Sequence, residues 1–430
     1  MINLLNIKLI REHPEVVRQN LKKRGDVEKL QMLDDLINND QEWRRLLTEA
    51  NELRHKRRKI TVEIAAFKKA GKPTEKHIEK GRKLDAEIVA LEKHVEKHKQ
   101  NANHILIRLP NLLHESVPIG KDENDNAEVK VWGKPPKFDF KPKNHLKIAR
   151  GLGLIDDERG AKVAGHGFFY LKGDLVLLDL ALQRFAINSM VKKGYQLIEP
   201  PFMLRRKPYE GVTDLADFEN VMYKVEDEDL YLIATAEHPL AAMFMNEVLL
   251  KDDLPIKLVG VSSCFRKEVG AHGKYTKGLF RMHQFNKVEQ FIFCLSSDSW
   301  NFHEELQQNA EELYQTLGLH YKAVNVCTGD IGTVAAKKYD INVWMADGIY
   351  REVGSNSNCT DYQARRLNIR YRGKEGQAPQ GFVHTINNTA LATSRTMLAI
   401  LEQHQQKDGS VLIPKALTKY MNGLEKLEPH

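Results

Sequence analysis

The feature that most limits how this chain can fold is an apolar repeat in its first quarter. Residues 26 to 70 contain no glycine or proline and are rich in Leu, Glu, Lys, Arg and Gln, which favour helices. Apolar residues recur on alternating three- and four-residue steps, with Arg57 as the one polar occupant. They are Leu36, Trp43, Leu46, Ala50, Leu53, Ile60, Ile64 and Phe67. The pattern predicts a long helix with a coiled-coil seam.

A second helix is predicted directly after the first. Gly71-Lys72-Pro73 interrupts helical structure, and the apolar repeat then restarts with His98 inside it. The repeating positions are Leu84, Ile88, Leu91, Val95, Ala102 and Ile105. We therefore expect two antiparallel helices joined by a tight tip, each on the order of 50 Å long.

Positive charge is concentrated in the same region. Residues 1 to 110 hold 25 lysines and arginines against 17 acidic residues, while the other 320 residues hold 40 against 41. Basic residues gather toward the tip: Arg54, Lys56, Arg57, Arg58, Lys59, Lys68, Lys69 and Lys72. With few aromatic residues to stack on bases, this arm suits double-stranded nucleic acid held by its phosphates and shape. A dimerisation or spacer coiled coil with a solvated basic face is the alternative.

Composition excludes several other classes of protein. Of the 430 residues, 42% are hydrophobic and 29% charged, as in soluble globular chains, and no apolar run reaches the length of a membrane helix. The first residues lack the pattern of a signal peptide, so we expect a cytoplasmic protein without a membrane partner. The four cysteines lie about 30 residues apart without a Cys-x-x-Cys pair, so no disulfide framework and no zinc are expected.

The rest of the chain is predicted to be α+β. A stretch rich in Pro, Gly and Asn, with the acidic run Asp122 to Asp125, marks a boundary near 110 to 150. Further on, 174 to 193 is predicted as a helix that Gly194 ends, and 195 to 199 as a short strand stopped by Pro200.

Residues 256 to 295 carry an unusual density of charge. Two strands are predicted, at 256 to 261 and 281 to 289, on either side of a glycine-rich loop at 269 to 278. In extended chain Arg266 and Glu268 share a face, as do Lys287 and Glu289. A charged ligand would explain this crowding, and a surface ion-pair ladder is the alternative. No Walker loop, Gly-x-Gly-x-x-Gly or His-Glu-x-x-His occurs, so a nucleotide would be held by arginine, carboxylate and metal.

At these residues the chain resembles one known family, the seryl-tRNA synthetases of class II. Residues 194 to 203 are similar to class II motif 1, 265 to 268 with 281 to 285 to motif 2, and 390 to 395 to motif 3. The combination of Thr235-Ala236-Glu237, the run from Arg281 to Glu289 and Asn-Cys-Thr-Asp-Tyr-Gln-Ala-Arg-Arg at 358 to 366 is specific to this family. The similarity covers nearly the whole chain, including the basic hairpin.

The resemblance implies a division of the chain and a reaction. Residues 1 to 110 would form a tRNA-binding helical hairpin and coiled coil, 111 to 150 a linker, and 151 to 430 a class II catalytic domain with an antiparallel sheet flanked by helices. The enzyme would be a homodimer with the motif 1 proline at its interface. It would activate L-serine with ATP and transfer it to the 3′ end of tRNA(Ser), and of tRNA(Sec) as well, with the hairpin contacting the long variable arm.

The resemblance also implies how ATP is held. Arg266 would hold the α-phosphate and the serine carboxylate, Arg395 the γ-phosphate, and Glu352 with Ser355 would bind Mg²⁺; Arg266, Glu352 and Arg395 are the expected catalytic residues. Glu268 would accept from the adenine amino group, and Phe285 would stack on the ring. The full implied ATP set is Arg266, Lys267, Glu268, Met282, Phe285, Glu352, Val353, Gly354, Ser355 and Arg395.

Serine recognition is implied at a separate set of residues. Thr235 and Glu237 would bind the α-amino group, and Glu289, Asn387 and Thr389 would surround the hydroxyl, with Arg266 on the carboxylate. Such a site rejects alanine because its own polar groups would stay unpaired, a penalty that reaches about 10⁴-fold.

Three positions depart from the family pattern. Gly354 and Asn356 stand where serine and cysteine are usual, and Gly167 stands where arginine is common.

Three alternatives remain at this stage. A synthetase paralogue that loads a carrier protein would lack the hairpin. An RNA-binding protein on an inactive synthetase body would lose Arg266, Glu289 or Arg395, and all three are present. A zinc-dependent form would need another context for Cys264 and Cys359.

Overall fold

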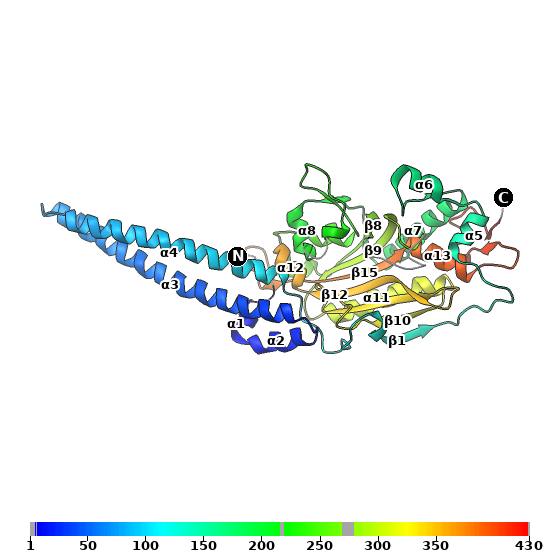
Figure 1. Cartoon of the computed structure of the whole chain (residues 1–430), viewed down its shortest axis with the longest axis horizontal. Helices are drawn as coiled ribbons and strands as arrows, with labels where there is room; N and C mark the ends of the chain where they lie inside the picture. The colour runs from blue at the N-terminus through cyan, green and yellow to red at the C-terminus, as the bar shows by residue number, and fades with distance from the viewer. Residues whose placement is uncertain (1–4, 6, 216–218, 269–278, 429–430) are drawn as a thin grey trace. The chain divides into compact units, whose positions relative to one another are not determined.

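The computed structural model describes residue 5 and residues 7–215, 219–268 and 279–428. The glycine-rich loop expected at 269 to 278 lies outside the described residues. The chain divides into two compact units, Met1–Pro110 and Asn111–His430, and each is described by itself (Figure 1).

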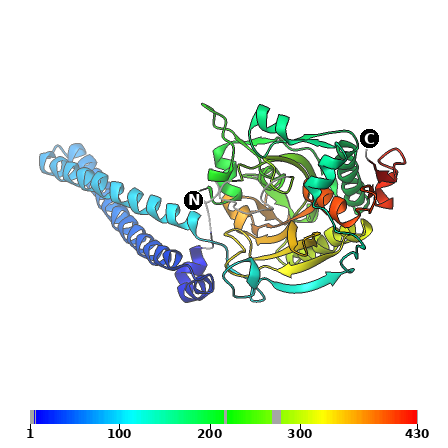
Figure 2. The ribbon, with the colours of Figure 1, turned by 45° about the vertical axis from the view of Figure 1, so that its right-hand side comes forward.

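The first unit is helical throughout its described part. It consists of α1 (Ile7–Glu12), α2 (Pro14–Lys22), α3 (Val27–Lys69) and α4 (Glu75–Arg108). The side chain of Asp26 caps α3 by accepting from the backbone N–H of Lys29. Gly71, with φ of +69°, begins the turn into α4. Figure 2 shows α3 and α4 side by side, which confirms the predicted antiparallel hairpin.

The seam between α3 and α4 follows the predicted repeat. Leu36, Leu46 and Ala50 are buried, and towards the tip Leu53 and Ile60 are half-buried while their neighbours face solvent. Polar residues in and beside the seam bond across the hairpin as well. Arg57 binds Asp85 through Nε at 2.8 Å, Arg54 binds Glu92 through Nη2 at 2.6 Å, and His98 Nδ1 lies 3.0 Å from Asn39 Oδ1.

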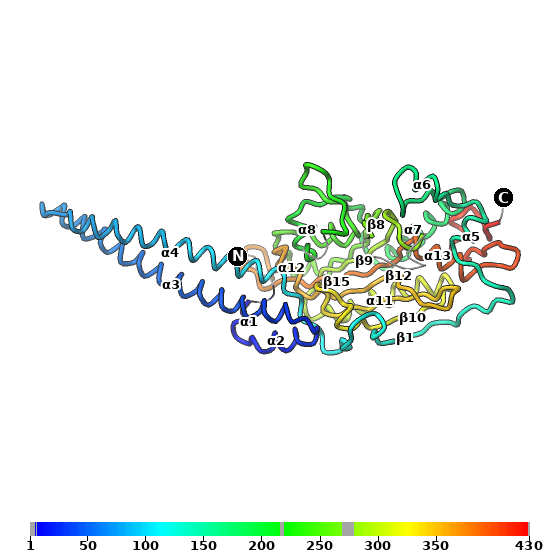
Figure 3. Tube along the Cα trace, viewed as in Figure 1, coloured from blue at the N-terminus to red at the C-terminus, as the bar shows by residue number. Residues whose placement is uncertain are grey.

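The second unit is built on an eight-stranded sheet, whose path through the chain can be followed in Figure 3. In spatial order the strands are β1 (Ala127–Trp132), β10 (Tyr321–Asn325), β11 (Lys337–Trp344), β12 (Tyr350–Thr360), β15 (His384–Ala392), β9 (Gln284–Cys294), β8 (Ile256–Phe265) and β4 (Gln196–Ile198). Neighbouring strands are antiparallel from β1 to β8, and β4 runs parallel to β8. The mostly antiparallel sheet confirms the predicted fold class.

Helices cover both faces of this sheet. On one face α7 (Asp174–Lys192), α11 (Ser299–Thr316) and α13 (Thr393–Gln403) pack against the central strands, around Val288 and Ile292 of β9. On the other face α8 (Arg206–Val212), α10 (Glu237–Ala242) and α12 (Tyr362–Leu367) lie around Phe291 and Phe293. We call this second face the site face. The alternation follows from the two-residue period of β9.

The remaining elements are short. They are α5 (His145–Gly151), β2 (Ile155–Asp156), α6 (Asp157–Ala164), β3 (Tyr170–Leu171), β5 (Met203–Leu204), β6 (Tyr231–Leu232), β7 (Val248–Leu250), β13 (Arg370–Arg372), β14 (Gly381–Phe382), β16 (Val411–Leu412), α14 (Lys415–Thr418) and β17 (Lys426–Leu427). None of the helices in the described part of the chain combines the length and apolarity needed to span a bilayer.

Residues 111 to 150, treated as a linker above, contribute structure to the second unit. Asn111 donates to the carbonyls of Val334 and Cys359 at 2.9 and 2.8 Å, and β1 forms one edge of the sheet. The segment is therefore anchored to the body along much of its length.

One local prediction was wrong. Arg266 and Glu268 do not share a strand face, because β8 ends at Phe265 and Glu268 has a positive φ of +51°. The chain turns out of the sheet there, while Lys287 and Glu289 do share a face of β9 as expected.

Candidate active site

Several predicted site residues lie on the site face because of strand register. Residues opposite one another in antiparallel strands point to the same face. Asn387 of β15 stands opposite Phe291 of β9 and also opposite Ser357 of β12. Thr389, two residues after Asn387, and Ser355, two before Ser357, therefore share this face.

A β-bulge brings Glu352 to the same face. Glu352 and Ser355 are three residues apart, so a regular strand would turn them to opposite faces. Glu352 and Gly354 instead pair with consecutive residues of β11, which makes Val353 an extra residue in β12. Val353 enters the core at 1% exposure, and the Ser355 hydroxyl donates to Glu352 Oε1 at 3.4 Å.

A buried group of charges lies between β9, β15 and α10. Glu289 is 1% exposed and forms an ion pair with Lys287, which also donates to Thr389 Oγ1 at 3.4 Å. Glu237, at the start of α10, accepts from Asn387 Nδ2 at 3.1 Å. Thr235 Oγ1 accepts from the backbone N–H of Glu237 at 3.2 Å. All the residues predicted for the amino and hydroxyl groups of serine are thus brought together.

The protonation of this buried group is strongly perturbed. Burial, reinforced by the nearby charge of Glu289, raises the pKa of Glu237 to about 7. Burial also raises the pKa of Glu289, against the opposing effect of Lys287. The pKa of the adjacent His238 falls to about 3 because burial and the two cations Lys287 and Arg266 disfavour its charged form. Because burial disfavours the charged forms of both carboxylates, a bound ammonium group would favour their ionisation.

A second group of charges lies around Glu352. Arg395, in the first turn of α13, donates through Nη1 to the carbonyl of Glu352 at 2.9 Å and to its Oε1 at 3.2 Å. Burial opposes ionisation of Glu352, but Arg395, Lys338 and Arg266 together lower its pKa. This carboxylate is ionised and lies in a cationic setting suited to phosphate and metal.

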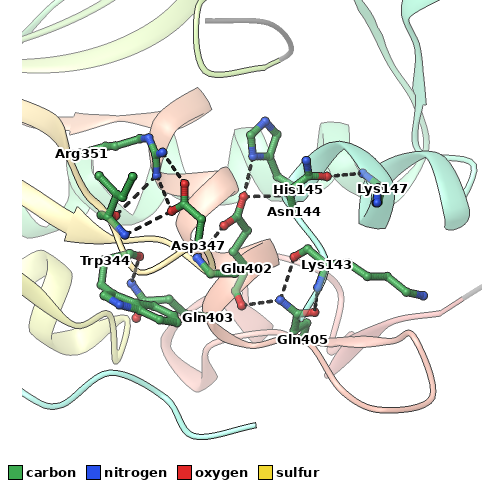
Figure 4. Close-up of polar contacts among 12 residues, drawn as sticks. Lys143, Asn144, His145, Lys147, Trp344, Asp347, Arg351, Glu402, Gln403 and Gln405 are labelled. Atoms are coloured by element: carbon green, nitrogen blue, oxygen red, sulfur yellow. Dashed lines mark hydrogen bonds and ion pairs between the residues drawn. The ribbon is translucent and has the colours of Figure 1, made fainter. Parts of the chain in front are cut away.

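The helix that carries Arg395 is fixed at its far end (Figure 4). Glu402, fully buried near the C-terminus of α13, accepts from His145 Nδ1 at 2.6 Å and from the backbone N–H of Ala346 at 2.8 Å. Gln403 donates to the carbonyl of Trp344 at 2.9 Å. These bonds join α13 to α5 and to the turn between β11 and β12, so Arg395 and Glu352 are held in one framework.

The proposed nucleotide end lies where β8 and β9 leave the sheet. Arg266 lies over the Phe285 ring at 5.3 Å and donates through Nε to the carbonyl of Ala234 at 3.3 Å. Glu268 Oε2 lies 3.7 Å from Arg281 Nη1. The backbone N–H of Lys267 donates to the carbonyl of Val221.

A cavity of about 160 Å³ adjoins this end of the site. It is lined by Phe168, Phe169, Leu171, Asp179, Met282, Gln284, Phe285, Asn286, Ser394 and Met397. Met282 and Phe285 are predicted nucleotide residues, but none of the charged residues predicted for the phosphates lines it. The cavity therefore marks one edge of the site.

The departures from the family pattern have separate physical explanations. A Cβ at Gly354 would lie 3.1 Å from Thr389 Cβ, so the position is crowded and offers its backbone only. Asn356 points away from the site face, donating to the carbonyl of His303 on α11 at 2.8 Å. A Cβ at Gly167 would lie 2.2 Å from the His283 ring, which occupies the space of a side chain there.

Oxygen ligands for a hard cation are present. Glu352 and Ser355 supply a carboxylate and a hydroxyl, the donor types that Mg²⁺ prefers. Among the described residues no group of three or more His, Cys, Asp or Glu is arranged to hold a metal ion. The donor set therefore fits a cation that is also held by substrate phosphates. The nearby buried Asp340 has an oxygen, Oδ1, for which the described part of the chain supplies no hydrogen-bond partner.

Sequence reasoning missed several residues of the site. Lys287 was noticed for its spacing but given no role, although it neutralises Glu289. Gln363 donates to Glu237 Oε1 at 2.9 Å, and Cys359 Sγ accepts from Asn387 Nδ2 at 3.6 Å. Asp340 was not singled out. The alternation of β9 could have found Lys287, whereas the other contacts come from register and burial.

The comparisons with known proteins agree with this geometry. Residues 223–404 match the tRNA synthetase class II core domain (G, H, P, S and T), so fold and site define a class II aminoacyl-tRNA synthetase. Residues 4–113 match the seryl-tRNA synthetase N-terminal domain. A serine–tRNA ligase of Methanocella arvoryzae is 55% identical over 425 residues, which cover 99% of this chain and 100% of the relative. The chain belongs to the seryl-tRNA synthetase family.

Two solved structures are similar over the whole chain. Seryl-tRNA synthetase from Pyrococcus horikoshii, complexed with ATP, gives a TM-score of 0.95 at 51% identity and covers 99% of this chain and 100% of that one. Cytoplasmic serine–tRNA ligase from Naegleria fowleri, in complex with AMP, gives 0.88 at 36% identity and covers 99% of each chain.

Proposed function

We propose that the charged groups on the site face activate L-serine with ATP and that the helical hairpin holds the acceptor tRNA. Membership of the family makes the chain an ATP-dependent serine–tRNA ligase. The observation that carries the residue assignment is that Glu237, Glu289 and Glu352 gather at the site face, where Arg395 reaches Glu352 from the first turn of α13. The charge of Arg266 acts on both Glu289 and Glu352.

The buried pocket is the proposed serine site. Glu237 and Thr235 bind the α-ammonium group, whose positive charge favours the ionised form of Glu237. Glu289, Asn387 and Thr389 surround the hydroxyl, and Arg266 holds the carboxylate. No general base is required because the attacking carboxylate is already ionised, so catalysis consists of positioning and charge stabilisation.

The cationic end is the proposed ATP site. Arg266 and Arg395 bind the α- and γ-phosphates, and Phe285 stacks on the adenine, with Glu268 on its amino group and Met282 nearby. Lys267, Val353 and Gly354 complete the set, the last two through their backbones. Glu352 and Ser355 hold Mg²⁺, which when bound neutralises phosphate charge. The ATP bound in the Pyrococcus horikoshii relative supports this assignment.

The hairpin, residues 1 to 110, is the proposed binding element for tRNA(Ser), and for tRNA(Sec) as a second acceptor. Five cations near the tip are exposed: Lys56, Arg58, Lys59, Lys68 and Lys69. Among the described residues, none of the five has a carboxylate oxygen within 4.0 Å, whereas Arg54 and Arg57 are paired. They are available to phosphates. The arm therefore binds by charge and shape.

A homodimer is also part of the proposal. Apolar side chains on α7, β4 and β5 are 38% to 56% exposed: Val176, Leu180, Val191, Leu197 and Met203. They lie in and around motif 1, and β4 is an edge strand of the sheet. A second copy would cover them. We place the dimer in the cytoplasm.

Serine- and ATP-dependent pyrophosphate exchange tests the proposal, measured with all twenty amino acids. Arg266→Ala is expected to lower exchange with serine at least 10²-fold because it removes charge stabilisation at the reacting phosphate. Arg159→Ala, which breaks a surface ion pair with Asp156, is the matched control and should leave exchange unchanged. Exchange with another amino acid, or full activity in Arg266→Ala, would contradict the assignment.

A further inference from the structure

Asp340 is a buried carboxylate beside the proposed metal site that has so far been given no role. It lies on β11 directly opposite Ser355 of β12 and is 4% exposed. Its neighbours are Ser355, its partner on the adjacent strand, Glu352 from β12, and Lys338 from its own strand, whose Nζ lies 3.9 Å from Oδ2. Oδ1 has no hydrogen-bond partner among the described residues.

Burying a carboxylate costs free energy unless hydrogen bonds and opposite charge compensate for the lost hydration. Asp340 has one long contact with Lys338 at 3.9 Å. A well-packed apolar residue would be less costly at this position. The arrangement therefore points to a task that requires an acceptor on this strand.

The serine hydroxyl suggests what that task is. A hydroxyl has one proton to donate and lone pairs to offer as an acceptor or ligand. The Ser355 hydroxyl donates to Glu352 Oε1 at 3.4 Å, and the carboxylate of Asp340 stands on the opposite strand. If Ser355 and Glu352 both offer oxygen to a cation, the proton must point away from it. Asp340 is then the acceptor left for the proton.

We propose that Asp340 is a positioning residue that accepts the Ser355 hydroxyl proton and so turns a serine lone pair toward the divalent cation. The inference rests on the proposed function, because it assumes that Glu352 and Ser355 hold that cation. Groups that orient metal ligands in this way typically change metal affinity 10- to 100-fold. Lys338 favours the charged form of Asp340 electrostatically, and its Nζ, 3.9 Å from Oδ2, leaves the carboxylate available as an acceptor.

The test measures cation binding directly. Mn²⁺ is titrated by electron paramagnetic resonance into the full-length protein saturated with a non-hydrolysable ATP analogue. Asp340→Leu removes the acceptor and should weaken Mn²⁺ binding about 10- to 100-fold. Asp340→Asn keeps an acceptor oxygen without the charge and should retain most of the affinity. Equal losses in Leu and Asn would show that charge alone matters and would overturn the proposal.

A double-mutant cycle examines the route through serine. In a Ser355→Ala background there is no hydroxyl to orient, so Asp340→Leu should cause no further loss of Mn²⁺ affinity. A full additional loss would contradict the proposal. Asp347→Asn is the matched control, because Asp347 lies in the turn between β11 and β12 and pairs with Arg351. This variant should bind Mn²⁺ normally. Thermal unfolding of each variant without ligand separates this effect from misfolding.

Failure of the proposed function gives a different result. Glu352→Gln should also weaken Mn²⁺ binding if the metal site is correct. If Glu352→Gln has no effect, both the metal site and the role of Asp340 fall. If it weakens binding while Asp340→Leu does not, the metal site stands and the inference alone is wrong.

Discussion

The hairpin and the catalytic unit use the same kinds of charged residue in opposite ways. In the hairpin, Arg57 and Asp85 form an ion pair in solvent, with side chains 31% and 52% exposed. In the catalytic unit, Lys287 and Glu289 form an ion pair with side chains 7% and 2% exposed. Water screens the first pair, whereas the second interacts at low dielectric with every other charge nearby.

This difference in burial indicates different uses of charge in the two units. Exposed pairs of the hairpin tie two helices together and leave the remaining cations free to move, which suits a polyanionic partner. Buried pairs of the pocket cannot rearrange without cost, so their arrangement favours a ligand of matching charge. In the proposed function, the hairpin binds by the number of its charges and the pocket by their placement.

The same substitution in both units gives the largest expected contrast. Lys287→Met leaves Glu289 buried without its countercharge, which should lower the free energy of unfolding by about 3–5 kcal/mol. Arg57→Met in the hairpin should leave stability close to that of the unmodified protein, since its partner stays hydrated. Urea unfolding of the full chain measures both. Similar losses in the two variants would refute the contrast.

Neutralising cations at the tip should give the next largest effect. Lys56, Arg58 and Lys59 changed together to Gln should weaken tRNA binding about ten- to a hundredfold and make the salt dependence shallower by roughly one logarithmic unit per lost phosphate contact. Pyrophosphate exchange should be unchanged, because it needs no tRNA. Filter binding at several salt concentrations provides the measurement, and an unchanged slope would exclude this surface.

The smallest predicted effect is the pH dependence of serine binding. The raised pKa of Glu237, about 7, means that its carboxyl group is protonated below that pH and must lose a proton to bind the ammonium group. Serine affinity should therefore rise about tenfold between pH 6 and pH 8. Calorimetric titration measures it. Glu237→Gln should bind serine more weakly with a flatter profile, and a variant that keeps the wild-type profile would assign the titration to another group.

Much of the fold could be predicted because its signals are periodic. The three- and four-residue repeat located α3, α4 and the turn at Gly71, since a seam needs apolar residues wherever the helices touch. The helix from 174 followed from its apolar stripe and from Gly194. Strands were predicted at 256 to 261 and 281 to 289, and the observed β8 and β9 begin at Ile256 and Gln284. Residues 111 to 150 were less well predicted, because their Pro, Gly and Asn content indicated a linker and β1 is exposed along nearly all its length, although Ala127, Val129 and Val131 alternate with polar residues in it.

The site was predictable in composition and less so in arrangement. The family motifs supplied Arg266, Glu289 and Arg395 as candidates, and the structure places them near one another. The contacts made by Gln363 and Asp340 depend on strand register and burial, which no local pattern encodes. The turn after Phe265 was missed because a run of charged residues is compatible with either strand or loop.

The extra residue at Val353 has a consequence for anyone who redesigns this enzyme. A β12 without it would still look like a sound strand and could hydrogen-bond along its whole length. The carboxylate of Glu352 would then face the apolar core on the opposite side of the sheet. The proposed phosphate end of the site would lose this carboxylate. A bulge of one residue thus determines which face of the sheet carries the Glu352 carboxylate.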